Sequence, residues 1–340
     1  MEIMDIDIPC KSAIGLLTLR EFNHFTLARQ WELANRFERI EDVRKAGLDH
    51  SNSDRHRMKS DEDAAWLLAY ETALMIQNEA KRRNVQIVTV FDAEYPPLLR
   101  LAPGAPLLLY VRGRLPGGMK NVACIGTRSP SHFGREITIK TVEKLVHNGW
   151  CAISGLALGV DTLAHRAALD AGGQTAAVLG NGLDSIYPKR NESLAQRILD
   201  SGGALISELP FDEKAIPQNL VARNRIQSGM SIAVIVMETD FPGGSFHTVR
   251  FSLLQNRPVF TPIPPKGQKD TAINAGFQML TQMAGRELVE PLNAKGNFAK
   301  LLTTTFSYRP IASSFSPNAI DELVHQLDRC YEKIQPESIG

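Results

Sequence analysis

The sequence has few cysteines, no long apolar run and no basic leader segment. Its four cysteines, Cys10, Cys124, Cys151 and Cys330, lie far apart and form no Cys-x-x-Cys pair. This spacing argues against a disulfide framework or a cysteine zinc site and predicts reduced core thiols. A transmembrane helix needs about 18 or more consecutive apolar residues, and no such run occurs. We therefore expect a cytoplasmic protein with no membrane association.

The chain also lacks an excess of charge of either sign. It carries 38 Lys and Arg against 37 Asp and Glu, a formal net charge of +1. Composition therefore gives no overall electrostatic signature of a nucleic-acid or membrane partner, and any site for a polyanion must be local. With 340 residues, 43% of them hydrophobic, the chain is long enough for two compact domains and too apolar to be mostly disordered.

Three regions differ in their pattern. Residues 1–84 carry apolar side chains at helical spacing and predict a small all-helical domain. In residues 85–292, near-continuous apolar strands alternate with helices, which predicts an α/β domain with an extended Rossmann-like parallel sheet covered by helices on both faces. Residues 293–340 are expected to form an extension with one amphipathic helix, AIDELVHQLDRCYEKI, packed on the main domain or on a partner subunit.

The loops that follow the strands of 85–292 hold most of the glycines and unusual polar residues. In such a sheet, ligands bind outside the carboxyl ends of the strands. The dinucleotide fingerprint Gly-x-Gly-x-x-Gly is absent, which argues against ordinary NAD binding. The apolar run NVACI is followed instead by Gly126, Thr127 and Arg128. The glycine lets a ligand approach the backbone closely, the threonine offers a hydroxyl, and the arginine offers a guanidinium suited to phosphate. The alternative is a tight turn with a solvated arginine.

Two further loops combine glycine with ionisable residues. In SGLALGVDTLAH, Ser154 and Gly155 end a strand, and Asp161 is expected to cap the helix that carries His165. This pair is either a cap with a satisfied histidine or a metal or acid–base site. In GNGLDSIYPKRN, Lys189 is placed to contact phosphate or is simply solvated. Glu208 in ISELP is a loop brace or an acid.

The last two segments supply arginines and backbone donors. Arg223, Asn224 and Arg225 lie in a helical stretch, where two arginines two positions apart point in different directions unless the turn is irregular or begins the helix. The alternative for this segment is an exposed basic surface. The stretch Gly243-Gly244-Ser245 follows a strand that ends at Glu238 and leads directly into a helix, so its free N–H groups favour an anion.

Taken in order, these motifs resemble those of the DprA/Smf family of DNA-processing proteins. The resemblance rests on AEYPPLLR, PLLLYVRG, IGTR, SGLALGVDTLAH, GNGLDSIYPKRN, ISELP, ARNRIQSGMS and PVFTPIP, which follow in family order and spacing. The helical N-terminal region is similar in position and size to the sterile-alpha-motif-like domain of the family. Leu220 and Val221 stand where the family has Phe-Pro, so an aromatic that would stack a base is missing there.

The resemblance implies a non-enzymatic homodimer that binds single-stranded DNA and loads a RecA-type recombinase in DNA recombination and natural transformation. It implies neither a cofactor nor a metal. Carried over position by position, it predicts a phosphate-binding pocket built from Gly126, Thr127, Arg128, Ser154, Gly155, Arg223, Asn224 and Arg225, with Gly243, Gly244 and Ser245 at its rim.

Two alternatives stay open at this point. A DprA-like regulator or antitoxin would sense DNA or a nucleotide and restrain a toxin partner, a role that the missing aromatic and the short C-terminal extension favour. The other is a phosphoribohydrolase of the "lonely guy" type, whose Pro-Gly-Gly loop resembles residues 242–244. Those enzymes need a glutamate just after the loop, where this chain has Val249 and Arg250.

Overall fold

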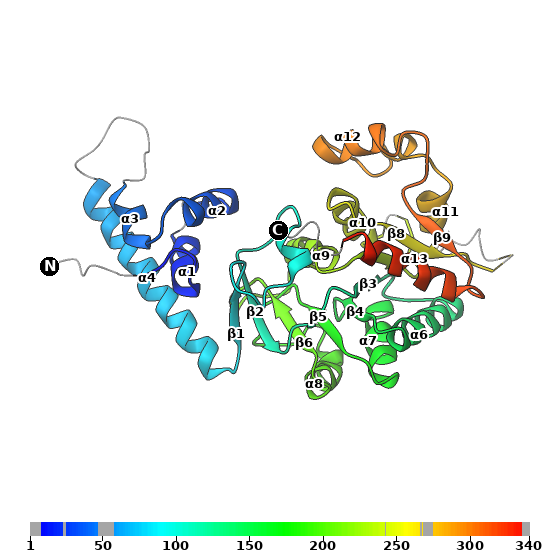
Figure 1. Cartoon of the computed structure of the whole chain (residues 1–340), viewed down its shortest axis with the longest axis horizontal. Coiled ribbons are helices and arrows are strands. Elements are labelled where there is room, and N and C mark those ends of the chain that lie inside the picture. Colours follow the sequence, from blue (N-terminus) through cyan, green and yellow to red (C-terminus); the bar gives the residue numbers. More distant parts are fainter. Residues whose placement is uncertain are drawn as a thin grey trace. The chain divides into compact units, whose positions relative to one another are not determined.

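The protein forms two compact units (Figure 1). The structure is a computed structural model that describes residues 8–22, 25–46, 58–241, 243–265, 267 and 275–334, with the backbone alone at 58–62. The first unit comprises the described residues of 1–95 and 106–112, and the second those of 96–105 and 113–340. The segment 85–112, which the sequence assigns to the α/β domain, is thus divided between the units.

Helices make up most of the first unit, as residues 1–84 predicted. Ser12 and Thr26 begin two of them, because their hydroxyls accept hydrogen bonds from the backbone N–H groups of Gly15 at 3.1 Å and Arg29 at 3.3 Å. The fourth helix spans Met58–Arg82 and contains Asp63. The helices are α1 (Ala13–Glu21), α2 (Leu27–Arg36), α3 (Ile40–Lys45) and α4 (Met58–Arg82).

The core of this unit lies between α1 and α4. Leu16 and Leu19 on α1 are fully buried, and the ring of Phe22 meets that of Trp66 on α4 edge-on at 5.1 Å. A short antiparallel hairpin, β1 (Gln86–Thr89) and β2 (Leu108–Gly113), completes the unit. A hydrogen bond of 2.8 Å from Arg20 on α1 to the hydroxyl of Tyr110 on β2 links the helices to this hairpin.

The second unit is built on a parallel sheet with the strand order β6-β5-β4-β3-β7-β8-β9. The Rossmann-like α/β fold that the sequence predicted is confirmed by this arrangement. The chain runs outward through β4, β5 and β6 on one side of β3 and then returns to β7 on the other side. The strands are β3 (Asn121–Ile125), β4 (Cys151–Ser154), β5 (Thr175–Val178), β6 (Ala204–Ser207), β7 (Ala233–Val236), β8 (Val259–Pro262) and β9 (Ser313–Phe315).

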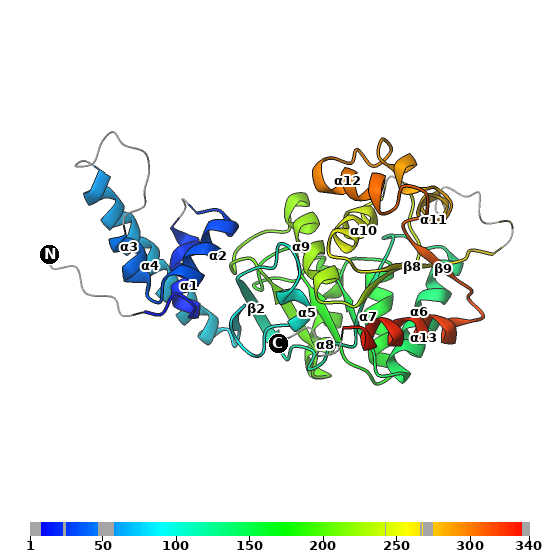
Figure 2. The same cartoon turned by 45° about the horizontal axis from the view of Figure 1, so that its top comes forward.

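Both faces of the sheet are buried, which explains why its strands are apolar throughout. On β3, Val122 and Cys124 belong to the core on one face, and Ala123 and Ile125 to the core on the other. Figure 2 shows α6, α7, α8 and α13 below the sheet and α9, α10 and α12 above it. The helices are α5 (Pro97–Arg100), α6 (His132–His147), α7 (Val160–Asp170), α8 (Glu192–Asp200), α9 (Pro217–Gly229), α10 (Ser245–Leu254), α11 (Ala275–Thr281), α12 (Gly296–Thr304) and α13 (Ile320–Glu332), with short 3-10 turns η1 (Lys189–Asn191) and η3 (Gly285–Leu288).

The C-terminal residues are part of this unit and contribute to its sheet. Strand β9 pairs in parallel with β8, an element that the sequence analysis missed because its three residues are polar at two positions. The amphipathic helix was predicted correctly and is α13. It packs on α6, where Lys144 and Asp321 form an ion pair of 2.6 Å and Leu323 and Leu327 are fully buried.

The cysteines are free thiols, and Cys10 and Cys124 are buried. Burial raises the pKa of the Cys10 thiol to about 12, so this group stays protonated at neutral pH. In the part of the chain that the structure describes, no helix is long and apolar enough to cross a membrane.

Candidate functional site

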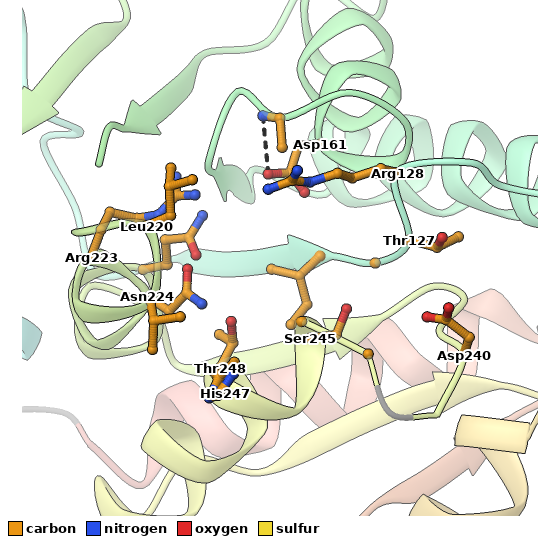
Figure 3. Close-up of a pocket in the computed structure, with 17 residues that line it drawn as sticks. Thr127, Arg128, Asp161, Leu220, Arg223, Asn224, Asp240, Ser245, His247 and Thr248 are labelled. Atoms are coloured by element: carbon orange, nitrogen blue, oxygen red, sulfur yellow. Dashed lines mark hydrogen bonds between the residues drawn. The ribbon is translucent and has the colours of Figure 1, made fainter. Parts of the chain in front are cut away.

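A pocket of about 360 Å³ lies at the carboxyl ends of β3 and β7. These two strands are neighbours in the sheet, and the chain leaves them in opposite directions, which is the switch point where ligands bind in folds of this kind. Figure 3 shows Arg128 reaching in from the loop after β3, opposite Arg223 and Asn224 on α9, with Ser245, His247 and Thr248 on α10. The topology alone therefore gathers segments that are more than 100 residues apart in the sequence.

The turn after β3 is held on both sides. The N–H of Thr127 donates to the carbonyl oxygen of Glu238 at 2.7 Å, and the carbonyl oxygen of Thr127 accepts from the N–H of Val160 at 3.1 Å. A Cβ atom at Gly126 would lie 2.6 Å from a methyl carbon of Val160 and 2.7 Å from the Glu238 carbonyl oxygen, so glycine is required there. Arg128 thus extends from a fixed backbone.

Glu238 also braces the start of the next helix. Its carboxylate accepts two hydrogen bonds from Ser131, one from the backbone N–H and one from the hydroxyl, both of 2.7 Å. The side chain of Ser131 in turn caps α6 by accepting from the N–H of Gly134 at 3.1 Å. Because its carboxylate is buried and engaged in this way, Glu238 fixes the loop that carries Arg128.

Arg128 is exposed at the mouth of the pocket. Its guanidinium has no ion-pair or hydrogen-bond partner within the described ranges of the chain. Its positive charge contributes to lowering the pKa of Arg223, so the two groups are close enough to interact. A cation without a protein partner, beside a second cation, favours an anionic ligand.

Arg223 forms part of the floor of the pocket and is 7% exposed. It reaches from α9 to the ends of two strands, where Nη1 donates to the carbonyl oxygens of Gly155, at 2.8 Å, and Val178. Burial lowers its pKa to about 10, the nearby carboxylate of Asp161 opposes this shift, and Arg128 adds to it. Arg223 therefore remains charged at neutral pH.

Asp161 and His165 are structural groups in this arrangement. The carboxylate of Asp161 accepts from the N–H groups of Gly155 at 3.1 Å and Ala157 at 3.3 Å. The prediction that Asp161 caps α7 is wrong: the N-cap is Gly159, at φ +79°, and Asp161 reaches back to the preceding loop from the first turn. Burial raises the pKa of Asp161, with Arg223 and these backbone donors opposing the shift.

The side chain of His165 is fully buried beneath the pocket. Its Nδ1 lies 2.7 Å from the hydroxyl of Thr175. Burial, and to a smaller extent the charge of Arg223, lower its pKa to about 3, so the ring is neutral. No group of three or more His, Cys, Asp or Glu residues is arranged to hold a metal ion in the described part of the chain.

Arg225 lies outside the pocket, although it is only two residues from Arg223. Its guanidinium pairs with both carboxylate oxygens of Glu208, Nη2 to Oε1 at 2.6 Å, and its Nε donates to the carbonyl oxygen of Gly104 at 2.9 Å. Both positions are in the middle of α9, where side chains two residues apart point in different directions. The structure therefore brings Arg223, and not Arg225, to the pocket, and Glu208 acts as a brace.

Of the other predicted site residues, some line the pocket and others do not. Asn224 and the Gly243–Ser245 turn line the pocket. No side chain caps α10, and the N–H groups of Phe246 and His247 donate to the carbonyl oxygens of Gly243 at 3.1 Å and Gly244 at 3.2 Å. Ser154 is fully buried, and its hydroxyl donates to the carbonyl oxygen of Cys124 at 2.7 Å. Lys189 is exposed in η1 and is not part of the pocket wall.

Sequence reasoning missed some residues of the pocket. Gln227, one turn of α9 after Arg223, lines it, as do Asp240, His247 and Thr248. His247 and Thr248 fall in the first turn of α10, so the Gly-Gly-Ser motif signals their position once the helix start is known. The spacing of four residues from Arg223 places Gln227 on the same face of α9, a signal that identifies it once Arg223 is known to face the pocket.

The fold and this pocket define a class: a Rossmann-like protein with an arginine-lined pocket at the switch point of its sheet. The family described as DNA recombination-mediator protein A matches residues 86–293. This chain is a member of that family, which is the DprA/Smf family that the motifs resemble.

Individual relatives agree with this assignment. The chain is 41% identical over 185 residues to protein Smf of Escherichia coli, a match that covers 54% of this chain and 50% of that protein. It is 40% identical over 188 residues to protein Smf of Synechocystis sp., covering 54% and 47%. The matched part is about half the length of these curated relatives. The X-ray structure of DNA processing protein A from Streptococcus pneumoniae superposes with a TM-score of 0.60 at 27% identity, covering 76% of this chain and 90% of that one.

Proposed function

We propose that this protein binds single-stranded DNA and acts in DNA processing without catalysing a reaction. The observation that carries the proposal is the placement of Arg128, which has no partner among the described residues, over the same pocket as Arg223 and the Gly243–Ser245 turn. Two guanidinium groups offer positive charge and hydrogen-bond donors to the phosphate oxygens of a strand backbone.

The different environments of Arg223 and Arg128 support a phosphate ligand. Arg223 is fixed by the carbonyl oxygens beneath it, so its charge is held in place before a ligand arrives. Arg128 is exposed and free to form a bidentate contact. The phosphate set that we propose is Arg128, Asn224, Ser245, the hydroxyl of Thr127 and the backbone of Gly243 and Gly244, over Arg223.

Family membership supports the wider role. The family is described as a recombination mediator. We propose on that basis that the chain forms a homodimer and delivers DNA to a RecA-type recombinase, as in natural transformation. The regulator or antitoxin alternative would use the same pocket for a free nucleotide.

The geometry does not favour a phosphoribohydrolase. Val249 on α10 is buried and Arg250 is exposed, so neither position offers a carboxylate to the pocket. Two carboxylates do line the pocket: Asp161 is committed to two backbone N–H groups, and Asp240 lies before the Gly243–Ser245 turn rather than after it. Release of free base from AMP would contradict this part of the proposal.

The direct test is fluorescence anisotropy with a labelled oligothymidylate over a series of salt concentrations, against duplex DNA and AMP as competitors. We expect binding to the single strand that weakens with salt. Arg128→Ala should lower the affinity and reduce the slope of log K against log [salt] by about 0.7, the value for one phosphate contact with a single strand. Arg166→Ala, which removes an exposed arginine of α7 away from the pocket, is the matched control.

Failure to bind the oligonucleotide at low salt, or an unchanged slope for Arg128→Ala, would contradict the proposal. Competition by AMP as strong as that by the oligonucleotide would favour the regulator that senses a free nucleotide.

A further inference from the structure

A second cavity continues the pocket on the side of α7. It measures about 60 Å³, and Arg128, Ala157, Leu220 and Arg223 line both cavities. A ligand that places a phosphate at Arg128 therefore has a direct path from the first cavity into the second. The second cavity is too small to enclose a nucleobase, so a base there would lie against its wall.

That wall is apolar, in contrast to the first cavity. Leu158, Tyr187 and Pro188 form it together with Leu220. Leu158 is 37% exposed and Tyr187 is 46% exposed, although both are large hydrophobic residues. Among the described residues, none forms a hydrogen bond or ring contact with Tyr187, so its ring is available to a ligand.

The two cavities together match the chemistry of a nucleotide unit. One end offers guanidinium groups to a phosphate, and the other offers an aromatic face and aliphatic side chains to a base. Such a combination of cationic groove and exposed ring is how proteins hold single strands without reading their sequence. Leu220, between the two ends, has no π face. Among the described residues that line the two cavities, Tyr187 supplies a six-membered aromatic ring for stacking.

We propose that Tyr187 stacks on a base of the strand whose phosphate Arg128 binds, so that this site takes a base and its adjoining phosphate rather than a phosphate alone. The inference rests on the proposed binding of single-stranded DNA. It assigns to Tyr187 and Leu158 a contact with the base and explains why these side chains are left exposed beside charged ones.

The experiment compares variants in oligothymidylate binding at fixed salt. Tyr187→Ala should weaken binding about 5- to 150-fold, the loss expected for one stacked base. Tyr187→Phe and Tyr187→Trp should bind as the unchanged protein does or more tightly, because they keep the ring. Tyr308→Ala, which removes a tyrosine that is 82% exposed elsewhere in the same unit, should have no effect.

A second measurement separates stacking from a structural role. Oligothymidylates with a single abasic site at successive positions should lose affinity for the unchanged protein at one position, and that loss should vanish in Tyr187→Ala. A 5-iodouracil at the same position should crosslink to Tyr187 on irradiation. The slope of log K against log [salt] should be the same in Tyr187→Ala as in the unchanged protein, since no phosphate contact is removed.

Equal affinities of the unchanged protein and Tyr187→Ala, or abasic losses that are the same in both, would overturn the inference while leaving DNA binding in place. Absence of salt-dependent binding by the unchanged protein would instead reject the proposed function itself. If Tyr187→Ala does not fold, binding by Tyr187→Phe and the crosslink still decide the question.

Discussion

Nη1 of Arg223 lies 2.8 Å from the carbonyl oxygen of Gly155 and also donates to that of Val178. This single guanidinium joins α9 to the ends of β4 and β5, so the floor of the pocket and the loops around it depend on one side chain. The close approach is possible because residue 155 has no side chain: a Cβ atom there would lie 2.0 Å from Nη1.

Gly155→Ala should therefore destabilise the protein. The added methyl group forces Arg223 or the backbone to move, and overpacking of this kind costs about 1–3 kcal/mol. Urea denaturation followed by circular dichroism measures the change in the free energy of unfolding. Gly117→Ala, at a position where a Cβ atom meets nothing within 4 Å, is the matched control and should be neutral. Equal stability of the two variants would show that the Arg223 contact is not constrained as described.

Arg225→Ala should affect stability rather than DNA binding. Its guanidinium braces Glu208 and the Gly104 carbonyl oxygen, and losing hydrogen bonds to charged groups costs about 1–3 kcal/mol. The salt slope of oligonucleotide binding should stay unchanged, whereas Arg128→Ala should show the reverse: an altered slope and unchanged stability. A lower salt slope in Arg225→Ala would mean that Arg225 leaves Glu208 to bind phosphate.

Glu238→Gln should weaken DNA binding although Glu238 does not line the pocket. The amide keeps one acceptor for Ser131, but its NH2 group cannot accept the second hydrogen bond, so the loop carrying Arg128 loosens. We expect an affinity loss of about fivefold, corresponding to about 1 kcal/mol. Anisotropy with the oligothymidylate measures it. Ser131→Ala removes the hydrogen bond to Glu238 and also the cap of α6, so it should give a loss at least as large. Unchanged affinity in both variants would contradict a positioning role.

The stability of the protein should fall with acidification because of His165. Burial keeps the pKa of this histidine at about 3 in the folded state, whereas an unfolded histidine titrates near its ordinary value of about 6.5. Between these values the unfolded chain binds the extra proton, so stability is complete above about pH 6.5 and decreases as pH falls toward about 3. The loss should reach about 2 kcal/mol by about pH 5.

Urea denaturation at about pH 7.5 and about pH 5 measures this loss. His165→Gln should reduce the difference between the two conditions, and His147→Gln, at an exposed histidine, should leave it unchanged. An equal pH dependence in His165→Gln and the unchanged protein would show that another group is responsible.

The order of strands and helices followed from the sequence because each strand of a parallel sheet is buried on both faces and reads as an apolar run. NVACI, WCAIS and IAVIVME are such runs, and β3, β4 and β7 fall within them. The sequence analysis missed strand β9 because Ser313 and Ser314 are exposed. An edge strand need not be buried on both faces, so its residues need not be apolar.

The candidate site was only partly visible in the sequence. Glycine turns marked Gly126 to Arg128 and Gly243 to Ser245, because close backbone packing restricts those positions to small residues. The separate fates of Arg223 and Arg225 follow from helix geometry, and the sequence indicated that they point apart. Which of them lines the pocket depends on how α9 packs on the sheet. It also depends on the hydrogen bonds between Arg225 and the carboxylate of Glu208, which join segments that are distant in the sequence.

The sequence by itself determined that the glycine turns and arginines follow the strands, and it predicted an anion site there; the structure has a pocket at these strand ends. Tertiary structure alone decided which cations remain available: Arg225 is paired with Glu208, Arg223 is held against carbonyl oxygens, and Arg128 is left without a protein partner among the described residues. It also decided that Tyr187 lies beside Arg128. The physical reason is that neutralisation and proximity of charges depend on distances across the fold, which local patterns of residues do not encode.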